Sequence, residues 1–150
     1  MGKEIERKFL VKELPASLNE YPYHELEQGY LNTDPVVRVR KEDEIYYLTY
    51  KGKGYIEKEE YNLSLNEDAY NHLVAKADGN IISKKRYLIP CEPYTIELDI
   101  FSEPFAPLVI AEVEFPTLEE AKSFTPPEWF GEDVTGDYHY SNSYLSQKKI

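Results

Sequence analysis

Two carboxylates and a lysine alternate with other residues near the start of the chain, in the segment Glu4–Lys8. Successive side chains of a strand point to opposite faces, so the alternation predicts a strand with Glu4, Glu6 and Lys8 on one face. Paired carboxylates are hard oxygen ligands that suit Mg²⁺ or Mn²⁺, and a neighbouring ammonium can bind an anion. On one isolated strand, however, such a face is most often the solvated side of an antiparallel sheet.

Later strand-like segments repeat this sorting of charges. The segment Val37–Arg40 places two arginines on one face and two valines on the other, while Ile96–Ile100 and Val109–Phe115 do the same with pairs of acids. A solvated sheet face usually mixes neutral and charged residues, whereas nearly every polar position here carries a full charge. Burying so many charges for stability alone is unfavourable, because desolvation can exceed the Coulomb energy. The pattern therefore favours a closed barrel with a charged, hydrated interior.

A further set of motifs follows the first strand in a fixed order. They are Gln28–Leu31, Arg38-x-Arg40, Lys51-Gly52, Glu59–Tyr61, Lys84-x-Arg86-Tyr87, Glu97-x-Asp99, Ala111–Glu114 and Val134–Asp137. The ordered set resembles the CYTH superfamily, the triphosphate tunnel metalloenzymes, over nearly the whole chain. This resemblance implies an α+β, mainly β fold: a closed antiparallel eight-stranded tunnel barrel with a charged lumen and a few external or capping helices. Family members often carry an acid at the position of Asn62.

Alternation and the resemblance together predict the residues of the lumen. The inward acids are Glu4, Glu6, Glu60, Glu97, Asp99, Glu112 and Glu114, and the inward bases are Lys8, Arg38, Arg40, Lys51, Lys58, Lys84 and Arg86. Arginine forks onto phosphate oxygens and lysine supplies a point charge, so the predicted substrate-binding residues are Lys8, Arg38, Arg40, Lys51, Lys84 and Arg86. The predicted ligands of Mg²⁺ or Mn²⁺ are Glu4, Glu6, Glu60, Asp99, Glu112 and Glu114.

Composition limits the partners. The 150 residues predict a single domain, residues 1–150, and a net charge of −11 disfavours nucleic acid and anionic membranes. One cysteine, Cys91, rules out an intramolecular disulfide. The sequence contains no apolar run near the roughly 20 residues of a membrane span, and it begins with the predicted strand, so we expect no signal peptide and a cytoplasmic location. A monomer or a homodimer is expected.

Periodicity predicts the order of the elements. Strands are expected at 4–11, 24–32, 36–41, 45–51, 55–65, 81–89, 94–101 and 108–115. Asn66 is the predicted N-cap of a helix on the barrel exterior, and Thr117 the N-cap of a second, short helix. A last helix is predicted over 135–149.

The resemblance implies a metal-dependent triphosphatase that attacks the terminal phosphorus and releases orthophosphate. Lys8 and Lys84 are the predicted catalytic residues, because they would stabilise charge on the transferring or leaving phosphate. Phosphoryl transfer needs mainly positioning and charge neutralisation, so no serine–histidine pair is required. Inorganic triphosphate is the favoured substrate (PPPi to PPi + Pi), with other triphosphates also open. The alternatives are a class IV-type adenylyl cyclase, a thiamine-triphosphatase and a non-catalytic polyphosphate or nucleotide sensor.

Overall fold

The computed structural model describes residues 3–149, and its strands form one antiparallel sheet. The strand order is β5-β4-β3-β2-β6-β7-β8-β1-β9. The strands are β1 (Lys3–Val11), β2 (Tyr23–Thr33), β3 (Val36–Glu42), β4 (Ile45–Lys51), β5 (Glu57–Leu65), β6 (Asp78–Cys91), β7 (Tyr94–Phe101), β8 (Val109–Glu114) and β9 (Phe130–Asp133). A 3-10 turn, η1 (Leu18–Glu20), lies between β1 and β2.

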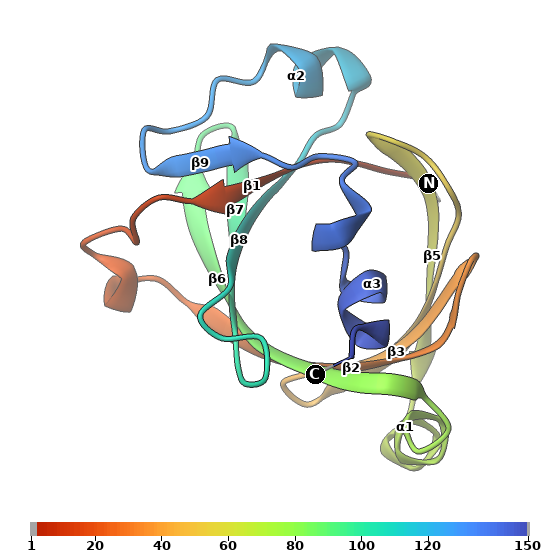
Figure 1. The fold of residues 1–150 in the computed structure, drawn as a ribbon. Helices are drawn as coiled ribbons and strands as arrows, with labels where there is room; N and C mark the ends of the chain where they lie inside the picture. Colours follow the sequence, from red (N-terminus) through yellow and green to blue (C-terminus); the bar gives the residue numbers. More distant parts are fainter. Residues whose placement is uncertain (1–2, 150) are drawn as a thin grey trace.

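Strand β1 closes the sheet into a barrel. Its first residues, Lys3–Ile5, pair with β5, and the following residues, Glu6–Leu10, pair with β8. Strands β1 to β8 therefore form a ring (Figure 1), while β9 adds to the free edge of β1 outside that ring. The predicted closed antiparallel eight-stranded barrel is confirmed.

Apolar residues on the outer face of the barrel are covered by helices. Helix α1 (Glu67–Val74) buries Tyr70 against β2, β3 and β4, and Tyr70 donates a hydrogen bond to Glu27 at 2.8 Å. Helix α2 (Leu118–Ser123) and β9 cover the outer face of β1, β7 and β8, where Phe9, Leu98 and Val113 are buried. The outward-facing side chains of these strands form a hydrophobic core with the covering elements. The charged side chains therefore occupy the inward-facing positions.

The two predicted N-caps are confirmed. The Asn66 side chain accepts a hydrogen bond from the Ala69 N–H at 2.7 Å, and Thr117 Oγ1 accepts one from the Glu120 N–H at 3.1 Å. Each cap satisfies a donor that the first helical turn leaves unpaired.

The end of the chain differs from the prediction. In place of one helix over 135–149, residues 134–137 form a loop, followed by η2 (Tyr138–Tyr140) and the short α3 (Asn142–Gln147). Gly136, at φ +80°, and the Ser141 N-cap interrupt any longer helix. Strand β9 was not predicted, and β6 is longer than the expected 81–89.

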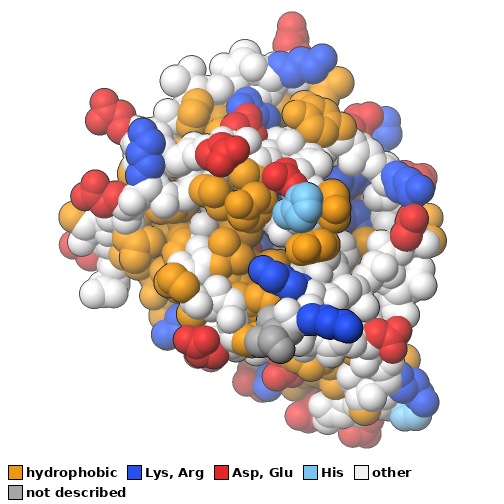
Figure 2. Space-filling view, viewed as in Figure 1, with side chains coloured by type: hydrophobic (Ala, Val, Ile, Leu, Met, Phe, Trp, Pro, Cys, Tyr) orange, Lys and Arg blue, Asp and Glu red, His pale blue; other side chains and the backbone are white. Residues whose placement is uncertain are grey.

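Residues 134–147, which we call the C-terminal segment, lie within the ring of strands (Figure 1). Leu145 of α3 packs against inward apolar residues of the barrel, with Tyr140 and Tyr144 beside it; the barrel residues of this cluster are Tyr30, Ile82, Phe101 and Ile110. Figure 2 shows hydrophobic side chains gathered over the middle of the ring on this face. One part of the barrel interior is therefore an apolar core, and the charged cavity occupies the rest. None of the helices among residues 3–149 is long and apolar enough to cross a membrane.

Candidate active site

A cavity of about 620 Å³ lies inside the barrel and is lined mainly by charged side chains. Its walls come from strands β1 to β8, the loop between β4 and β5, and the C-terminal segment. All the inward charges predicted from alternation line this cavity except Lys84 and Asp99. The structure therefore brings most of the predicted charged residues together in one cavity.

Three carboxylates, from Glu4, Glu6 and Glu114, form a compact group whose oxygens lie within 4.8 Å of one another. Glu4 Oε1 is buried and makes no hydrogen bond, although Lys51 Nζ lies 3.0 Å away. Burial and then Glu4 raise the pKa of Glu6, while desolvation and the neighbouring carboxylates raise the pKa of Glu114 to about 8. A compact set of hard oxygen donors that repel one another suits a divalent cation.

The other predicted metal ligands lie outside this group and pair with bases. Glu60 is 3.8 Å from Lys51, and Glu112 is 3.6 Å from Lys8 and 3.7 Å from Arg86. Both line the cavity, so their oxygens face the same space as the group of three.

The arginines of β3 present a concentration of positive charge. Arg40 Nε donates to Gln28 Oε1 at 2.6 Å, and Arg38 Nη2 donates to Thr49 Oγ1 at 3.2 Å. Arg38 Nε is buried without a hydrogen-bond partner among residues 3–149. Burial, followed by repulsion from Arg38 and Arg86, lowers the pKa of Arg40. Neighbouring guanidiniums with spare donors form a site for an anion with several oxygens.

Lys84 and Asp99 lie behind the cavity wall. Asp99 accepts two hydrogen bonds from Arg86, at 2.7 and 2.9 Å, and its other contact is Lys84 Nζ at 2.7 Å. Burial raises the pKa of Asp99, but Arg86 and Lys84 outweigh it and hold that pKa well below its usual range. Burial lowers the pKa of Lys84, and Asp99 opposes this shift. The structure thus places a predicted catalytic lysine and a predicted metal ligand in one buried ion pair.

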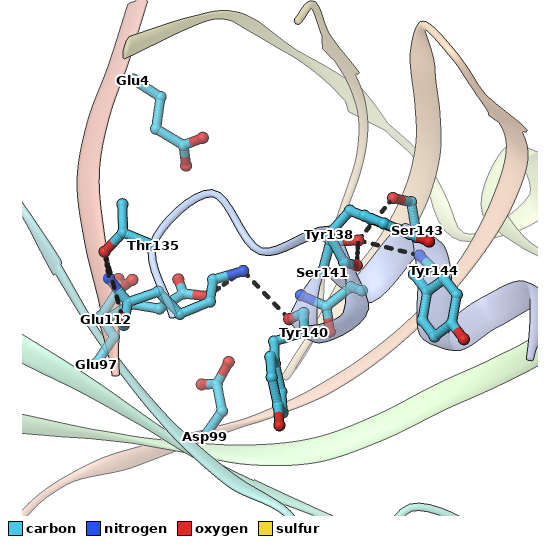
Figure 3. Close-up of polar contacts among 12 residues, drawn as sticks. Glu4, Glu97, Asp99, Glu112, Thr135, Tyr138, Tyr140, Ser141, Ser143 and Tyr144 are labelled. Carbon is cyan, nitrogen blue, oxygen red and sulfur yellow. Dashed lines mark hydrogen bonds and ion pairs between the residues drawn. The ribbon is translucent and has the colours of Figure 1, made fainter. Parts of the chain in front are cut away.

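Lys8, the other predicted catalytic residue, faces the cavity and contacts the C-terminal segment. Its Nζ lies 3.6 Å from Glu112 and donates to the Tyr140 carbonyl at 3.4 Å. Figure 3 shows Glu4, Glu97 and Glu112 on the barrel side of the cavity, facing the segment that carries Tyr138 and Ser141. The backbone N–H of Lys8 also donates to Thr135 Oγ1 at 2.9 Å, which ties the C-terminal segment to β1.

Sequence reasoning missed the contribution of this segment to the site. Tyr138, Ser141, Asn142 and Ser143 line the cavity, whereas the sequence predicted only a last helix there. Thr135 also lines the cavity and lies in the motif Val134–Asp137. A short segment without a strand-like or helical period carries no signal that it enters a barrel.

Asn62 of β5 also lines the cavity. Its Oδ1 accepts a hydrogen bond from Thr49 Oγ1 at 2.6 Å, and Thr49 in turn accepts one from Arg38. The amide therefore supports Arg38 through Thr49 without adding negative charge.

Comparison with known proteins settles the family, because the CYTH domain family matches residues 2–141. The chain belongs to the CYTH domain family. An inorganic triphosphatase of Nitrosomonas europaea is 38% identical over 149 residues, which are 95% of this CYTH chain and 96% of that protein. An inorganic triphosphatase of Acetivibrio thermocellus is also 38% identical, over 97% of this chain and 94% of the relative.

A solved structure supports the same relationship. The crystal structure of the inorganic triphosphatase NE1496 superposes with a TM-score of 0.72 at 35% identity, covering 97% of this CYTH chain and 95% of the other. The fold of this chain is therefore one already seen in an inorganic triphosphatase.

Proposed function

We propose that residues 1–150 act as one CYTH domain that hydrolyses inorganic triphosphate to pyrophosphate and orthophosphate with the help of Mg²⁺ or Mn²⁺. The observation that carries this proposal is that a group of carboxylates and a group of arginines face the same cavity. Three carboxylates lie within 4.8 Å of one another, and the same cavity holds Arg38, Arg40 and Arg86. The two relatives at 38% identity, both inorganic triphosphatases, support the choice of substrate.

The donor set fits a divalent cation, and we propose that Glu4, Glu6 and Glu114 hold it, with Glu60 and Glu112 as further oxygens on the same cavity. A bound Mg²⁺ or Mn²⁺ neutralises phosphate charge and lowers the pKa of water. We leave Asp99 out of the ligand set, because Arg86 and Lys84 occupy its carboxylate.

The basic residues of the cavity bind and orient the phosphate chain. Arg38, Arg40 and Arg86 donate to phosphate oxygens, and Lys8 and Lys51 supply point charges. In the reaction, a water oxygen bonds to the terminal phosphorus and the bridging P–O bond breaks. The electron pair of that bond leaves with pyrophosphate, and the proton of water passes to solvent. Lys8 is placed to stabilise the charge that develops during this transfer.

A panel of substrates tests the proposal. Purified protein is incubated with Mg²⁺ or Mn²⁺ and inorganic triphosphate, ATP, thiamine triphosphate or long-chain polyphosphate, and orthophosphate, pyrophosphate and cyclic AMP are measured. We expect the highest kcat/KM for inorganic triphosphate. Cyclic AMP and pyrophosphate from ATP would instead identify a cyclase, and binding without turnover at any metal or pH would identify a sensor.

A further inference from the structure

Asn142, the first residue of α3, connects the cavity with the buried ion pair of Lys84 and Asp99. Its side chain lines the cavity, and its Oδ1 accepts a hydrogen bond from Lys84 Nζ at 3.2 Å. The Lys84 side chain has no exposed surface and does not line the cavity. In this arrangement Asn142 joins Lys84 directly to the cavity, because its side chain lines the cavity and accepts the hydrogen bond from Lys84.

The contact with Lys84 determines how the amide is turned. The Lys84 ammonium has hydrogens to donate and no lone pair, so the oxygen of the amide must face it. Asp99, 2.7 Å from Lys84 Nζ, and the Phe101 ring, 5.0 Å away, hold the ammonium in place. The other branch of the amide, Nδ2 with two N–H donors, is therefore the branch left for a ligand.

These donors are available. Among residues 3–149, the hydrogen bond from Lys84 is the one that the Asn142 side chain makes. The charged groups that act on Lys84 are Asp99, Arg86, Arg40 and Glu112, so the amide lies at the end of the cavity where Arg40 and Arg86 supply positive charge. A hydrogen bond accepted from an ammonium polarises the amide and strengthens its N–H groups as donors.

We propose that Asn142 is a substrate-binding residue whose Nδ2 donates to a phosphate oxygen of the bound triphosphate, and that Lys84 is the residue that positions the amide. This inference rests on the proposed function, since it takes triphosphate as the ligand. It also assigns a role to a buried lysine that does not reach the cavity.

The first test compares Asn142→Ala with two controls in steady-state assays of triphosphate hydrolysis. A hydrogen bond to a charged oxygen contributes about 1.5–3 kcal/mol, so we expect KM to rise roughly 10- to 100-fold in Asn142→Ala. Gln147→Ala changes an exposed residue of α3 that does not line the cavity, and Asn80→Ala removes the two hydrogen bonds from Asn80 to the carbonyls of Leu145 and Lys148, at 3.0 and 2.7 Å. Neither control should raise KM by more than about twofold, a change of less than one ordinary hydrogen bond.

The second test is a double-mutant cycle with Lys84→Met, which removes the ammonium and leaves the contact between Asp99 and Arg86. If Lys84 acts by orienting the amide, Lys84→Met raises KM in the wild-type background and changes it little in the Asn142→Ala background. Effects that simply multiply would overturn the positioning role.

An unchanged KM in Asn142→Ala would overturn the binding role, and so would an equal rise in KM in Asn80→Ala, which would trace the effect to a loosened α3. Failure of the proposed function has a different signature. Wild-type protein would then release no phosphate. In that case calorimetry in EDTA would still measure the affinity of Asn142→Ala and of the wild-type protein for triphosphate. Equal affinities in that measurement would also count against the role of Asn142.

Discussion

Glu6 and Glu114 lie directly opposite one another in the ladder of β1 and β8, and together with Glu4 their carboxylates form one compact group. Like charges in directly opposed positions destabilise a sheet. Burial and then Glu4 raise the pKa of Glu6, while burial and then Glu97, Glu4 and Glu6 raise the pKa of Glu114. A cation between the carboxylates would reverse the sign of the interaction. The pair is therefore unfavourable in the free protein and suited to a bound metal.

The first prediction is that Glu6→Gln and Glu114→Gln raise the metal concentration needed for half-maximal activity. Each change removes one charged oxygen ligand, and we expect a rise of 10- to 100-fold, about the effect typical of altered metal-site residues. The matched control is Glu59→Gln. Glu59 is an exposed acid on β5, next to Glu60, and its side chain points to the opposite face of the strand. A metal titration of Glu114→Gln that overlays the wild-type curve would remove Glu114 from the ligand set.

The second prediction concerns the bases. Lys8→Ala should lower kcat and Arg40→Ala should raise KM, because the first is placed near the transferred charge and the second binds phosphate oxygens. Arg40→Ala should also lower the free energy of unfolding by about 1–3 kcal/mol, since it leaves Gln28 buried without its partner. Lys41→Ala, the next residue of β3 with the opposite parity, is the control. Wild-type kinetics in both Lys8→Ala and Arg40→Ala would contradict the assignment.

The third prediction separates two roles for Asp99. Asp99→Asn leaves Lys84 buried without its nearest counter-charge and weakens the two short hydrogen bonds that Arg86 donates to a carboxylate, and breaking a buried pair in this way costs about 3–5 kcal/mol of stability. Urea denaturation measures that loss, and a metal titration of the folded variant should match wild type. The reverse pattern, unchanged stability with weaker metal binding, would make Asp99 a metal ligand as the sequence predicted.

The fourth prediction is that the metal-free protein loses stability as the pH rises from 5 to 7. Burial raises the pKa of Glu97 to about 7 and desolvation raises that of Glu114 to about 8, from an ordinary value of 4.5. Both carboxyls bind protons more tightly in the folded state, so their contribution is complete below 4.5 and is lost as the pH rises toward these values. The pKa of Asp99 is depressed, so its contribution to stability develops at lower pH and does not change between pH 5 and 7.

Thermal unfolding at several pH values measures this trend. Adding Mg²⁺ with triphosphate should raise the melting temperature more at pH 8 than at pH 5.5, because ligands bind metal when deprotonated and a ligand of the folded state stabilises it. A melting temperature that rises between pH 5 and 7 without metal, or that is insensitive to the ligands, would contradict the account.

The comparison of sequence with structure shows what strand parity can and cannot reveal. Alternation predicts which face of a strand a residue occupies, and Glu4, Arg38 and Glu97 all line the cavity as expected. The alternation does not show where along the barrel an inward side chain lies, or whether other parts of the chain cover it. Lys84 and Asp99 have inward parity, yet they form an ion pair behind the wall, because two neighbouring strands bring them within 2.7 Å of each other.

The C-terminal segment was harder to predict for a different reason. Its position depends on contacts far apart in the sequence, such as Thr135 with Lys8 and Leu145 with the inward apolar residues of the barrel. In the structure Tyr140, Tyr144 and Leu145 pack on the apolar residues of the barrel interior. The sequence does not show that they pack inside the barrel, which is why Asn142 was missed as a site residue.

The most direct test of the central claim, that one charged cavity hydrolyses inorganic triphosphate with a metal, is ³¹P NMR of the reaction in ¹⁸O-labelled water. We predict that orthophosphate and pyrophosphate form in equal amounts only when Mg²⁺ or Mn²⁺ is present, with the label in orthophosphate. Label in pyrophosphate, or no turnover of triphosphate with either metal, would contradict the account.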